Sequence, residues 1–265
     1  MNPWNSEDVL RHPTALIHPD AVLAPNVRVG AYSLIGPGVT VGAGTVIHDH
    51  VRIAGRTTIG QRNRIYSFCS LGGEPQDKKY RGEESALEIG DDNTIREFCT
   101  FNLGTEEDVG VTRLGNHNWI MAYVHLAHDC QVGHHTTFAN HATLAGHVHV
   151  GDWVTLGGFV GVHQFVRIGA HSFIGISAVI TQDVPPYLLV AGIPAAPHGI
   201  NAEGLKRRGF TTEELSVLKQ AYRRLYRSGL SLEQAQQELT LLAQNAPCVL
   251  PLQEFLAQSA RGILR

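Results

Sequence analysis

Three residues whose chemistry suits acyl transfer recur at a spacing of eighteen: His128, Gly146 and Gln164. A neutral imidazole such as that of His128 can take a proton from an alcohol near pH 7, an effect worth roughly 10²–10⁴-fold in rate. The backbone N–H of Gly146 is unobstructed by a side chain, and a donor aimed at a developing oxyanion adds about 10²–10³-fold. Asp129 follows the histidine directly, and we identify no serine or cysteine nucleophile in this set. These residue types favour direct transfer of an acyl group to a hydroxyl.

The spacing is meaningful because an aliphatic or aromatic residue recurs at every sixth position over residues 114–180, and again over 17–71. A period of six fits neither a helix nor a hairpin meander, and it is typical of a parallel β-helix. Hexads that pair an aliphatic residue with glycine, such as Val150-Gly151, favour the left-handed, three-sided version, and we expect these glycines to serve corners that are strained for other residues. Residues one coil apart then lie about 4.8 Å apart. The three residues should therefore share one corner, close to His125, His147 and His163.

The hexad register is interrupted twice and stops after Val184. We therefore expect a mainly β fold: a left-handed parallel β-helix over residues 1–190, followed by a C-terminal α-helical domain over residues 191–265. Excursions are expected near 72–86 and near 104–112. The first is charged and rich in turn residues, which makes it a candidate binding loop, because loops that leave a rigid scaffold often carry function. We interpret the second as a solvated insertion.

Helix signals appear only in the C-terminal part of the chain. Thr212 is expected to cap a helix that runs to Arg227, with Gly229 at its C′ position. A capping box at Ser231–Gln234 opens a second helix, and a third is expected from Pro251 onward. These helices would cover the open end of the β-helix, where unpaired strand edges would invite aggregation. At the other end, the first ten or so residues are expected to form a loose cover.

The composition excludes several classes of protein. The net charge of −3 over 265 residues argues against a general nucleic-acid binder. The first twenty residues lack the apolar core of a secretory signal, and no apolar run approaches the roughly 20 residues that span a bilayer. The four cysteines show no metal-binding spacing, which predicts free thiols in a reducing compartment. We therefore expect a cytoplasmic protein with no nucleic-acid partner and no stable membrane insertion.

Ten of the fifteen histidines fall between His117 and His171. Zinc is one alternative, because the γ-class carbonic anhydrases are left-handed β-helices with a three-histidine metal site. That site uses a pair spaced H-x-x-x-x-H, and no two histidines of this chain are five apart. We therefore expect no metal. The histidines that we interpret as ordinary corner or surface residues are His117, His134, His135, His141 and His171.

Several motifs resemble those of the UDP-N-acetylglucosamine O-acyltransferases. They are A-H-D-C at 127–130, L-A-G-H-V at 144–148, H-Q-F at 163–165, Q-D-V-P-P-Y at 182–187 and N-A-E-G-L-K-R-R-G-F at 201–210. The similarity extends from about Ile17 to Arg265, and the last motif is too long to arise from hexad repetition. The resemblance implies transfer of a 3-hydroxyacyl group from acyl carrier protein to the glucosamine 3-hydroxyl of the UDP-sugar, the first step of lipid A synthesis.

The resemblance also implies a role for each matching residue. His128 would be the general base, Asp129 would orient it, and Gly146 would donate its N–H to the oxyanion. The residues that would bind substrate are His125, His147, His163 and Gln164 around the sugar and thioester, Gln76, Asp77 and Lys79 of a Q-D-x-K-Y motif at the sugar, and Asn201, Glu203, Arg207 and Arg208 at the uridine and diphosphate. Two adjacent arginines suit a diphosphate, although the same residues would also fit a solvated helix end. No cofactor is implied, because the acyl donor is carried on the phosphopantetheine of acyl carrier protein.

The chain departs from this family at two places. Where the family commonly has I-H-R-G, this chain has F-N-L-G at 101–104, which leaves open a paralogue that acylates another nucleotide sugar. Ile176 stands where enzymes that use longer acyl chains have glycine. Its branched side chain should block the far end of the acyl groove, which predicts a donor of about ten carbons, since each excluded methylene forfeits about 0.8 kcal/mol of burial.

The resemblance further implies a homotrimer with sites in the clefts between subunits, in which His128 of one chain works with loop residues of its neighbour. Acyl carrier protein is strongly acidic, and a basic patch for it is available in the helical region at Lys206, Arg207, Arg208, Arg223, Arg224 and Arg227. Two rivals remain. The related N-acyltransferases carry an extra N-terminal uridine-binding domain, for which we expect no room before Ile17. A noncatalytic β-helix that binds a nucleotide sugar is favoured only by Asn102-Leu103.

Overall fold

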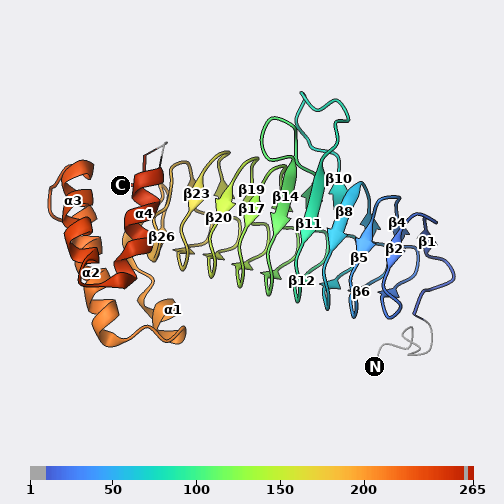
Figure 1. Cartoon of the computed structure of the whole chain (residues 1–265), viewed down its shortest axis with the longest axis horizontal. Helices are drawn as coiled ribbons and strands as arrows, with labels where there is room; N and C mark the ends of the chain where they lie inside the picture. Colours follow the sequence, from blue (N-terminus) through green and yellow to red (C-terminus); the bar gives the residue numbers. More distant parts are fainter. Residues whose placement is uncertain (1–9, 260–261) are drawn as a thin grey trace.

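The computed structural model describes residues 10–259 and 262–265. The chain forms a long three-sided prism of short strands with a group of helices packed at its C-terminal end (Figure 1). The loose N-terminal cover expected for the first ten or so residues falls almost wholly on residues 1–9, which lie outside the described residues.

The prism consists of three parallel sheets, which we call the first, second and third because they begin with β1, β2 and β3. The first sheet contains β1 (Leu16–Ile17), β4 (Leu34–Ile35), β7 (Arg52–Ile53), β10 (Ser70–Gly73), β13 (Thr100–Asn102), β16 (His125–Leu126), β19 (Thr143–Leu144), β22 (Gly161–Val162) and β25 (Val179–Ile180). The second contains β2 (Val22–Leu23), β5 (Thr40–Val41), β8 (Arg56–Ile59), β11 (Ala86–Ile89), β14 (Val111–Leu114), β17 (Gln131–Val132), β20 (His149–Val150) and β23 (Arg167–Ile168). The third contains β3 (Arg28–Val29), β6 (Val46–Ile47), β9 (Arg64–Ile65), β12 (Thr94–Ile95), β15 (Trp119–Ile120), β18 (Thr137–Phe138), β21 (Thr155–Leu156), β24 (Phe173–Ile174) and β26 (Leu188–Ala191), with the antiparallel β27 (Ala196–Ile200) at its end.

The strand register confirms the coil length inferred from the hexads. Leu126 pairs with Leu144, eighteen residues later, and each hexad position points into a continuous core. Leu71 instead pairs with Phe101, and Phe101 pairs with Leu126. The first excursion therefore adds twelve residues to a coil and the second adds seven, without breaking the stack. The two excursions leave the prism side by side, before β11 and before β14 (Figure 1).

The corners of the prism correct the expected role of glycine. Most corner positions with a positive φ are occupied by aromatic residues or histidines, such as His135 (φ 57°) and Trp153 (φ 62°), whose rings stack with centroids 4.1 Å apart. Gly151 is not in the left-handed region, but a Cβ there would lie 2.7 Å from the amide nitrogen of Ala170 on the next coil. The hexad glycines are thus needed for close approach between coils. The five histidines interpreted as corner or surface residues do lie at corners, and four of them take part in ring stacks: His117, His135, His141 and His171.

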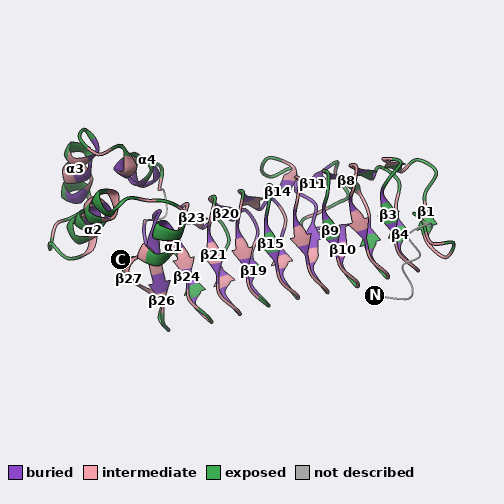
Figure 2. Cartoon of the chain, turned by 90° about the horizontal axis from the view of Figure 1, so that it is seen from below, coloured by how far each residue is buried: buried purple, intermediate pink, exposed green. Residues whose placement is uncertain are grey.

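The helical region has its own hydrophobic core, which includes Leu205, Leu239 and Phe255. The helices of this region are α1 (Ala202–Arg207), α2 (Thr212–Tyr226), α3 (Leu232–Ala243), the 3-10 turn η1 (Pro247–Val249) and α4 (Leu250–Gln258). Figure 2 shows these helices with their exposed faces turned outward. None of the helices within the described residues has the length and apolarity needed to cross a membrane.

The caps show where the helix predictions were accurate. The capping box at Ser231 is confirmed, with Gln234 as its partner. The cap of α2 is Thr211 rather than Thr212, because the Thr211 side chain accepts from the amide of Glu214, and α2 ends at Tyr226 with Arg227 as its C-cap. Gly229, with φ of 71°, therefore lies one position beyond C′.

Candidate active site

His128 and Asp129 lie on the edge of the prism between the first and second sheets, in the corner that connects β16 with β17. Asp129 adopts a φ of 60°, a conformation that aspartate tolerates better than most residues. Its amide donates to Thr112 Oγ1 at 2.8 Å. Its carboxylate lies against the preceding imidazole, with Oδ2 2.9 Å from His128 Nδ1. The corner thus forms the histidine–aspartate pair that the sequence predicted.

The Asp129 carboxylate is fully buried but remains ionised. Burial alone would raise its pKa, but hydrogen bonds from His128 and Thr105 outweigh burial and hold the pKa below its usual value. An ionised carboxylate only accepts hydrogen bonds, so His128 Nδ1 must carry the proton that lies between them. The basic lone pair of the neutral ring is then on Nε2. This is the tautomer that a general base needs.

Gly146 lies directly over this imidazole on the next coil. A Cβ at position 146 would lie 2.6 Å from both Cε1 and Nε2 of His128, so the ring occupies the space that any side chain would need. The His147 amide donates to the His128 carbonyl at 3.0 Å, and the Phe165 amide donates to the Gly146 carbonyl at 3.1 Å. These bonds confirm that His128, Gly146 and Gln164 lie on successive coils of one edge.

A second histidine–carboxylate pair lies beside the first. His147 is almost fully buried, its ring is perpendicular to that of His128 with centroids 4.9 Å apart, and it stacks on Phe165. Its Nδ1 lies 2.8 Å from Oδ2 of Asp108 and 3.9 Å from Oδ2 of Asp129. Two imidazoles and two carboxylates therefore form one connected cluster.

The same cluster has the residue types of a metal site. Among the described residues, His128, Asp129 and His147 bring ligand atoms within 4.8 Å of one another. Each of these side chains, however, is already paired: His128 with Asp129, His147 with Asp108, and Asp129 with Thr105. The arrangement is therefore accounted for as a hydrogen-bond network that fixes two imidazoles.

Thr105 and Asp108 belong to the second excursion, and their contacts show that its interpretation as a solvated insertion is wrong. Thr105 donates to the Asp129 carboxylate from both its amide and its hydroxyl, and Asp108 pairs with His147. The reason is geometric: the excursion starts and ends at the edge that carries His128. The one sequence feature that could have indicated a folded-back loop is the pair of glycines at its two ends, Gly104 and Gly110. In the structure their backbones pack together, and a Cβ on Gly104 would collide with the backbone of Gly110.

The other residues expected around the sugar and thioester are near this edge but differ in exposure. His125 projects from β16, and its Nδ1 lies 2.8 Å from Thr100 Oγ1. Burial lowers the pKa of His125, and the neighbouring His128 lowers it further. His163 is exposed, as is Gln164, whose carbonyl lies 3.1 Å from His163 Nδ1.

The first excursion carries Gln76, Asp77 and Lys79, and it contacts the second. Lys79 Nζ lies 3.1 Å from Glu107 Oε2, and this hydrogen bond raises the pKa of Lys79. The Asp77 carboxylate accepts from the Lys79 amide at 3.0 Å. Asn102 is buried, and its side-chain amide donates to the carbonyl of Glu74 at the root of this loop.

The residues expected to hold the nucleotide lie on a different edge, between the second and third sheets. Asn201 caps α1, and its side-chain amide donates to the carbonyl of His171 at 2.9 Å. Arg208 lies over the ring of Trp153 and close to the ring of His171. Burial, together with the charge of Arg208, lowers the pKa of His171 to about 4. Glu203 and Arg207 are exposed on α1 and do not join this cluster.

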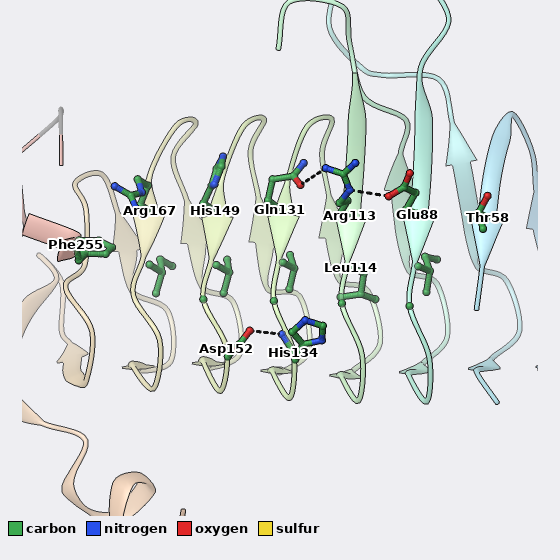
Figure 3. A pocket seen from close by; sticks show the side chains of 18 residues that line it. Thr58, Glu88, Arg113, Leu114, Gln131, His134, His149, Asp152, Arg167 and Phe255 are labelled. Carbon is green, nitrogen blue, oxygen red and sulfur yellow. Dashed lines mark hydrogen bonds and ion pairs between the residues drawn. The ribbon is translucent and has the colours of Figure 1, made fainter. Parts of the chain in front are cut away.

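A groove of about 690 Å³ lies between these two edges, over the second sheet (Figure 3). Arg113 bridges Glu88 and Gln131 across neighbouring strands, and Arg167 stacks on Phe255 of α4. The residues that line this groove do not include His128.

Ile176 lies on the third edge, between the third and first sheets, where its side chain is 70% exposed. One chain therefore carries the expected base, nucleotide site and chain-length residue on three separate edges.

Comparison with known proteins places these features in one family. The domain family described as Udp N-acetylglucosamine O-acyltransferase, domain 2, matches residues 183–264, and the bacterial transferase hexapeptide repeats match residues 12–43 and 112–146. The chain is 59% identical to the acyl-[acyl-carrier-protein]–UDP-N-acetylglucosamine O-acyltransferase of Thiobacillus denitrificans over 96% of its length and 98% of the relative. It is 62% identical to the protein of the same name from Paracidovorax citrulli, with the same coverage. A solved structure of UDP-N-acetylglucosamine O-acyltransferase from Moraxella catarrhalis superposes with a TM-score of 0.95 at 44% identity, over 97% of this chain and 100% of that one. The predicted left-handed β-helix is thereby confirmed.

Proposed function

The chain belongs to the UDP-N-acetylglucosamine O-acyltransferase family, and from this premise we propose how its own residues perform the reaction. The protein transfers an acyl group from acyl carrier protein to UDP-N-acetylglucosamine, the first step of lipid A synthesis. The observation that carries the proposed mechanism is the His128–Asp129 pair, with Nδ1 held at 2.9 Å and Nε2 turned toward Gly146. Asn102 and Leu103, which had left the acceptor open, are both buried, so a structural role accounts for them.

In this mechanism His128 Nε2 removes the proton of the glucosamine 3-hydroxyl as its oxygen attacks the thioester carbonyl. The negative charge that develops on the carbonyl oxygen is stabilised by the N–H of Gly146. Asp129 stabilises the imidazolium that forms and keeps its ring oriented. When the tetrahedral intermediate collapses, the C–S bond breaks and the proton on Nε2 passes to the leaving phosphopantetheine sulfur. The proposed steps need no further cofactor or metal.

The test of this function is acyl transfer by the purified protein from 3-hydroxydecanoyl-acyl carrier protein to UDP-N-acetylglucosamine, with the product identified by mass spectrometry. Donors of 10, 12 and 14 carbons are supplied in parallel, so that chain-length preference is separated from activity. Product from one of these donors is expected. A folded protein that forms none from any of them would overturn the proposed function.

We also propose that the active unit is a homotrimer with shared sites. The support is the distribution of the expected site over three prism edges, which cyclic association brings together in the clefts between subunits. A stacked stripe of exposed rings, including Phe68, Phe98 and Tyr123, offers apolar surface for this association. Light scattering should give three times the 28.9 kDa of one chain.

The chain length of the donor is proposed to depend on Ile176. We expect Ile176→Gly to shift preference from a ten-carbon to a longer 3-hydroxyacyl donor, since each methylene admitted to an apolar groove contributes about 0.8 kcal/mol, roughly fourfold in kcat/KM. The measurement is kcat/KM for the three donors, with Ile176→Val as the matched control that keeps the branch. Because Ile176 is largely exposed in one chain, the neighbouring subunit must complete the groove. A wild-type preference for fourteen carbons would contradict this role.

Acyl carrier protein is proposed to dock on the helical region, residues 191–265, which we regard as a separate domain. Arg223 and Arg227 are exposed at the C-terminal end of α2 and complement an acidic partner, whereas the neighbouring Arg224 is already ion-paired with Glu238. Reversing Arg223 and Arg227 to glutamate should raise KM for the carrier protein several-fold and leave KM for the UDP-sugar unchanged. Arg28→Glu, an exposed reversal at the far end of the prism, is the control. Equal effects of the two reversals would exclude a local docking patch.

Both substrates are compounds of the bacterial cytoplasm, which supports a cytoplasmic location without membrane insertion.

A further inference from the structure

Building on the proposed function, we propose that Thr105 is a positioning residue that holds the Asp129 carboxylate in the orientation on which the His128 base depends. The role belongs to a loop, residues 103–110, rather than to the β-helix itself. Thr105 does not contact the reacting atoms, and it acts through Asp129.

The contacts that carry this inference are concentrated on one carboxylate. The Thr105 amide lies 3.0 Å from Oδ1 and 3.1 Å from Oδ2 of Asp129, and the Thr105 hydroxyl donates to Oδ2 at 2.6 Å. Oδ2 is also the oxygen that pairs with His128. Because the amide is shared between the two oxygens, the hydroxyl is the Thr105 donor that holds Oδ2 specifically, and it thereby fixes the direction of the bond from Oδ2 to the imidazole.

Burial makes these donors necessary. Asp129 has no exposed surface and Thr105 is 3% exposed, so water does not solvate the carboxylate in their place. A buried charge is costly unless it is paired and hydrogen-bonded. Without the Thr105 hydroxyl, Oδ2 loses its shortest hydrogen bond, and the carboxylate is freer to turn away from His128.

Thr105 itself is held rigidly at the root of its loop. The Gly104 amide donates to the carbonyl of Ala86 at 3.1 Å, and the Ala86 amide donates to the carbonyl of Gly110 at 2.9 Å. Both ends of the loop are thus attached to the start of β11. The Gly104 backbone packs directly on Gly110, and this packing excludes a side chain at position 104. The hydroxyl is therefore pre-positioned before substrate binds.

The chain offers a closely matched control at Thr136. Like Thr105, Thr136 is almost fully buried and donates from both its amide and its hydroxyl to one side-chain oxygen, Oδ1 of Asn118. It lies on the edge between the second and third sheets, away from His128. Thr136→Val removes the same kind of hydrogen bond as Thr105→Val, so it reports what the loss costs in stability alone.

The experiment compares Thr105→Val, Thr105→Ala and Thr105→Ser in the active wild-type background, with kcat and both KM values measured. In metal sites, removing the outer hydrogen-bond partner of a histidine typically costs 10–100-fold in metal affinity or activity, and we take this as the scale for an outer partner of His128. We therefore expect Thr105→Val and Thr105→Ala to lose kcat by about 10–100-fold with KM changed less than twofold. Thr105→Ser, which keeps the hydroxyl, should stay within about threefold of wild type, and Thr136→Val should retain full kcat.

A double-mutant comparison separates positioning from general destabilisation. If Thr105 acts through Asp129, adding Thr105→Val to Asp129→Asn should cost little further activity, because coupled residues are not additive. The inference would be overturned by any of three results. They are a double variant that loses kcat by the full product of the two single losses, a Thr105→Val variant with wild-type kcat, and a Thr105→Ser variant as impaired as Thr105→Val. Absence of acyl transfer by the wild-type protein would instead overturn the proposed function.

Discussion

Replacing His128 with alanine is expected to lower kcat for acyl transfer by about 10²–10⁴-fold, the typical contribution of a positioned general base. The reason lies in the tautomer. The ionised carboxylate of Asp129 accepts a hydrogen bond from the protonated Nδ1, and this leaves Nε2 as the basic atom beside Gly146. The other imidazole of the cluster, His147, is also paired through Nδ1, with Asp108 of the loop, but it is the Nε2 of His128 that lies against Gly146. The measurement is initial velocity at saturating donor and acceptor.

The control for this prediction is His18→Ala. His18 is partly exposed near the N-terminal end of the prism and lies beside Asp20, so it offers a histidine next to a carboxylate without the corner geometry. Its removal should leave kcat unchanged. KM for the UDP-sugar should change less than kcat in the His128 variant, because the base acts on the transition state. A His128→Ala enzyme with near-wild-type kcat would exclude His128 as the base.

The sequence was sufficient for the parts of the site that follow from the coil length. Once the hexads set a coil of eighteen residues, the stacking of His128, Gly146 and Gln164 followed, since identical steps along the chain become vertical neighbours in a parallel β-helix. The same regularity identified His117, His135 and His141 as corner residues. These predictions needed no knowledge of loops.

The parts that could not be predicted depend on where irregular segments fold. Thr105 has no periodic relation to Asp129, and the contact arises only because an excursion of seven extra residues returns over its own starting edge. Gly151 was assigned to a strained corner, whereas the structure uses it to let two coils approach, a distance that no single-sequence pattern encodes. The short α1 was not among the helices predicted with bounds, because six residues carry almost no periodic signal; only the two arginines at its end were interpreted as fitting a solvated helix end.

Gly146 provides the second large expected effect. Gly146→Ala should lower kcat by about 10²-fold or more, because the added Cβ would lie 2.6 Å from Cε1 and Nε2 of His128 and must displace the ring. The backbone N–H at position 146 is retained, so the loss would not come from removing the oxyanion donor. Position 146 does not have a positive φ, and the backbone therefore accepts alanine without the strain that a left-handed conformation would impose.

The control for Gly146→Ala is Gly36→Ala, directly after β4 of the first sheet, near the N-terminal end. A Cβ at Gly36 would meet the carbonyl oxygen of Ile53 at 3.4 Å, an ordinary contact, so both fold and kcat should be kept. Combining Gly146→Ala with His128→Ala gives the decisive comparison. If alanine at position 146 acts by displacing the imidazole, it should cost little more once that ring is absent, because the methyl group that replaces the imidazole leaves room for the new Cβ. A full additional loss in the double variant would place the effect on the oxyanion donor instead, and Gly146 would then contribute through the direction of its N–H rather than through the space that it leaves for His128.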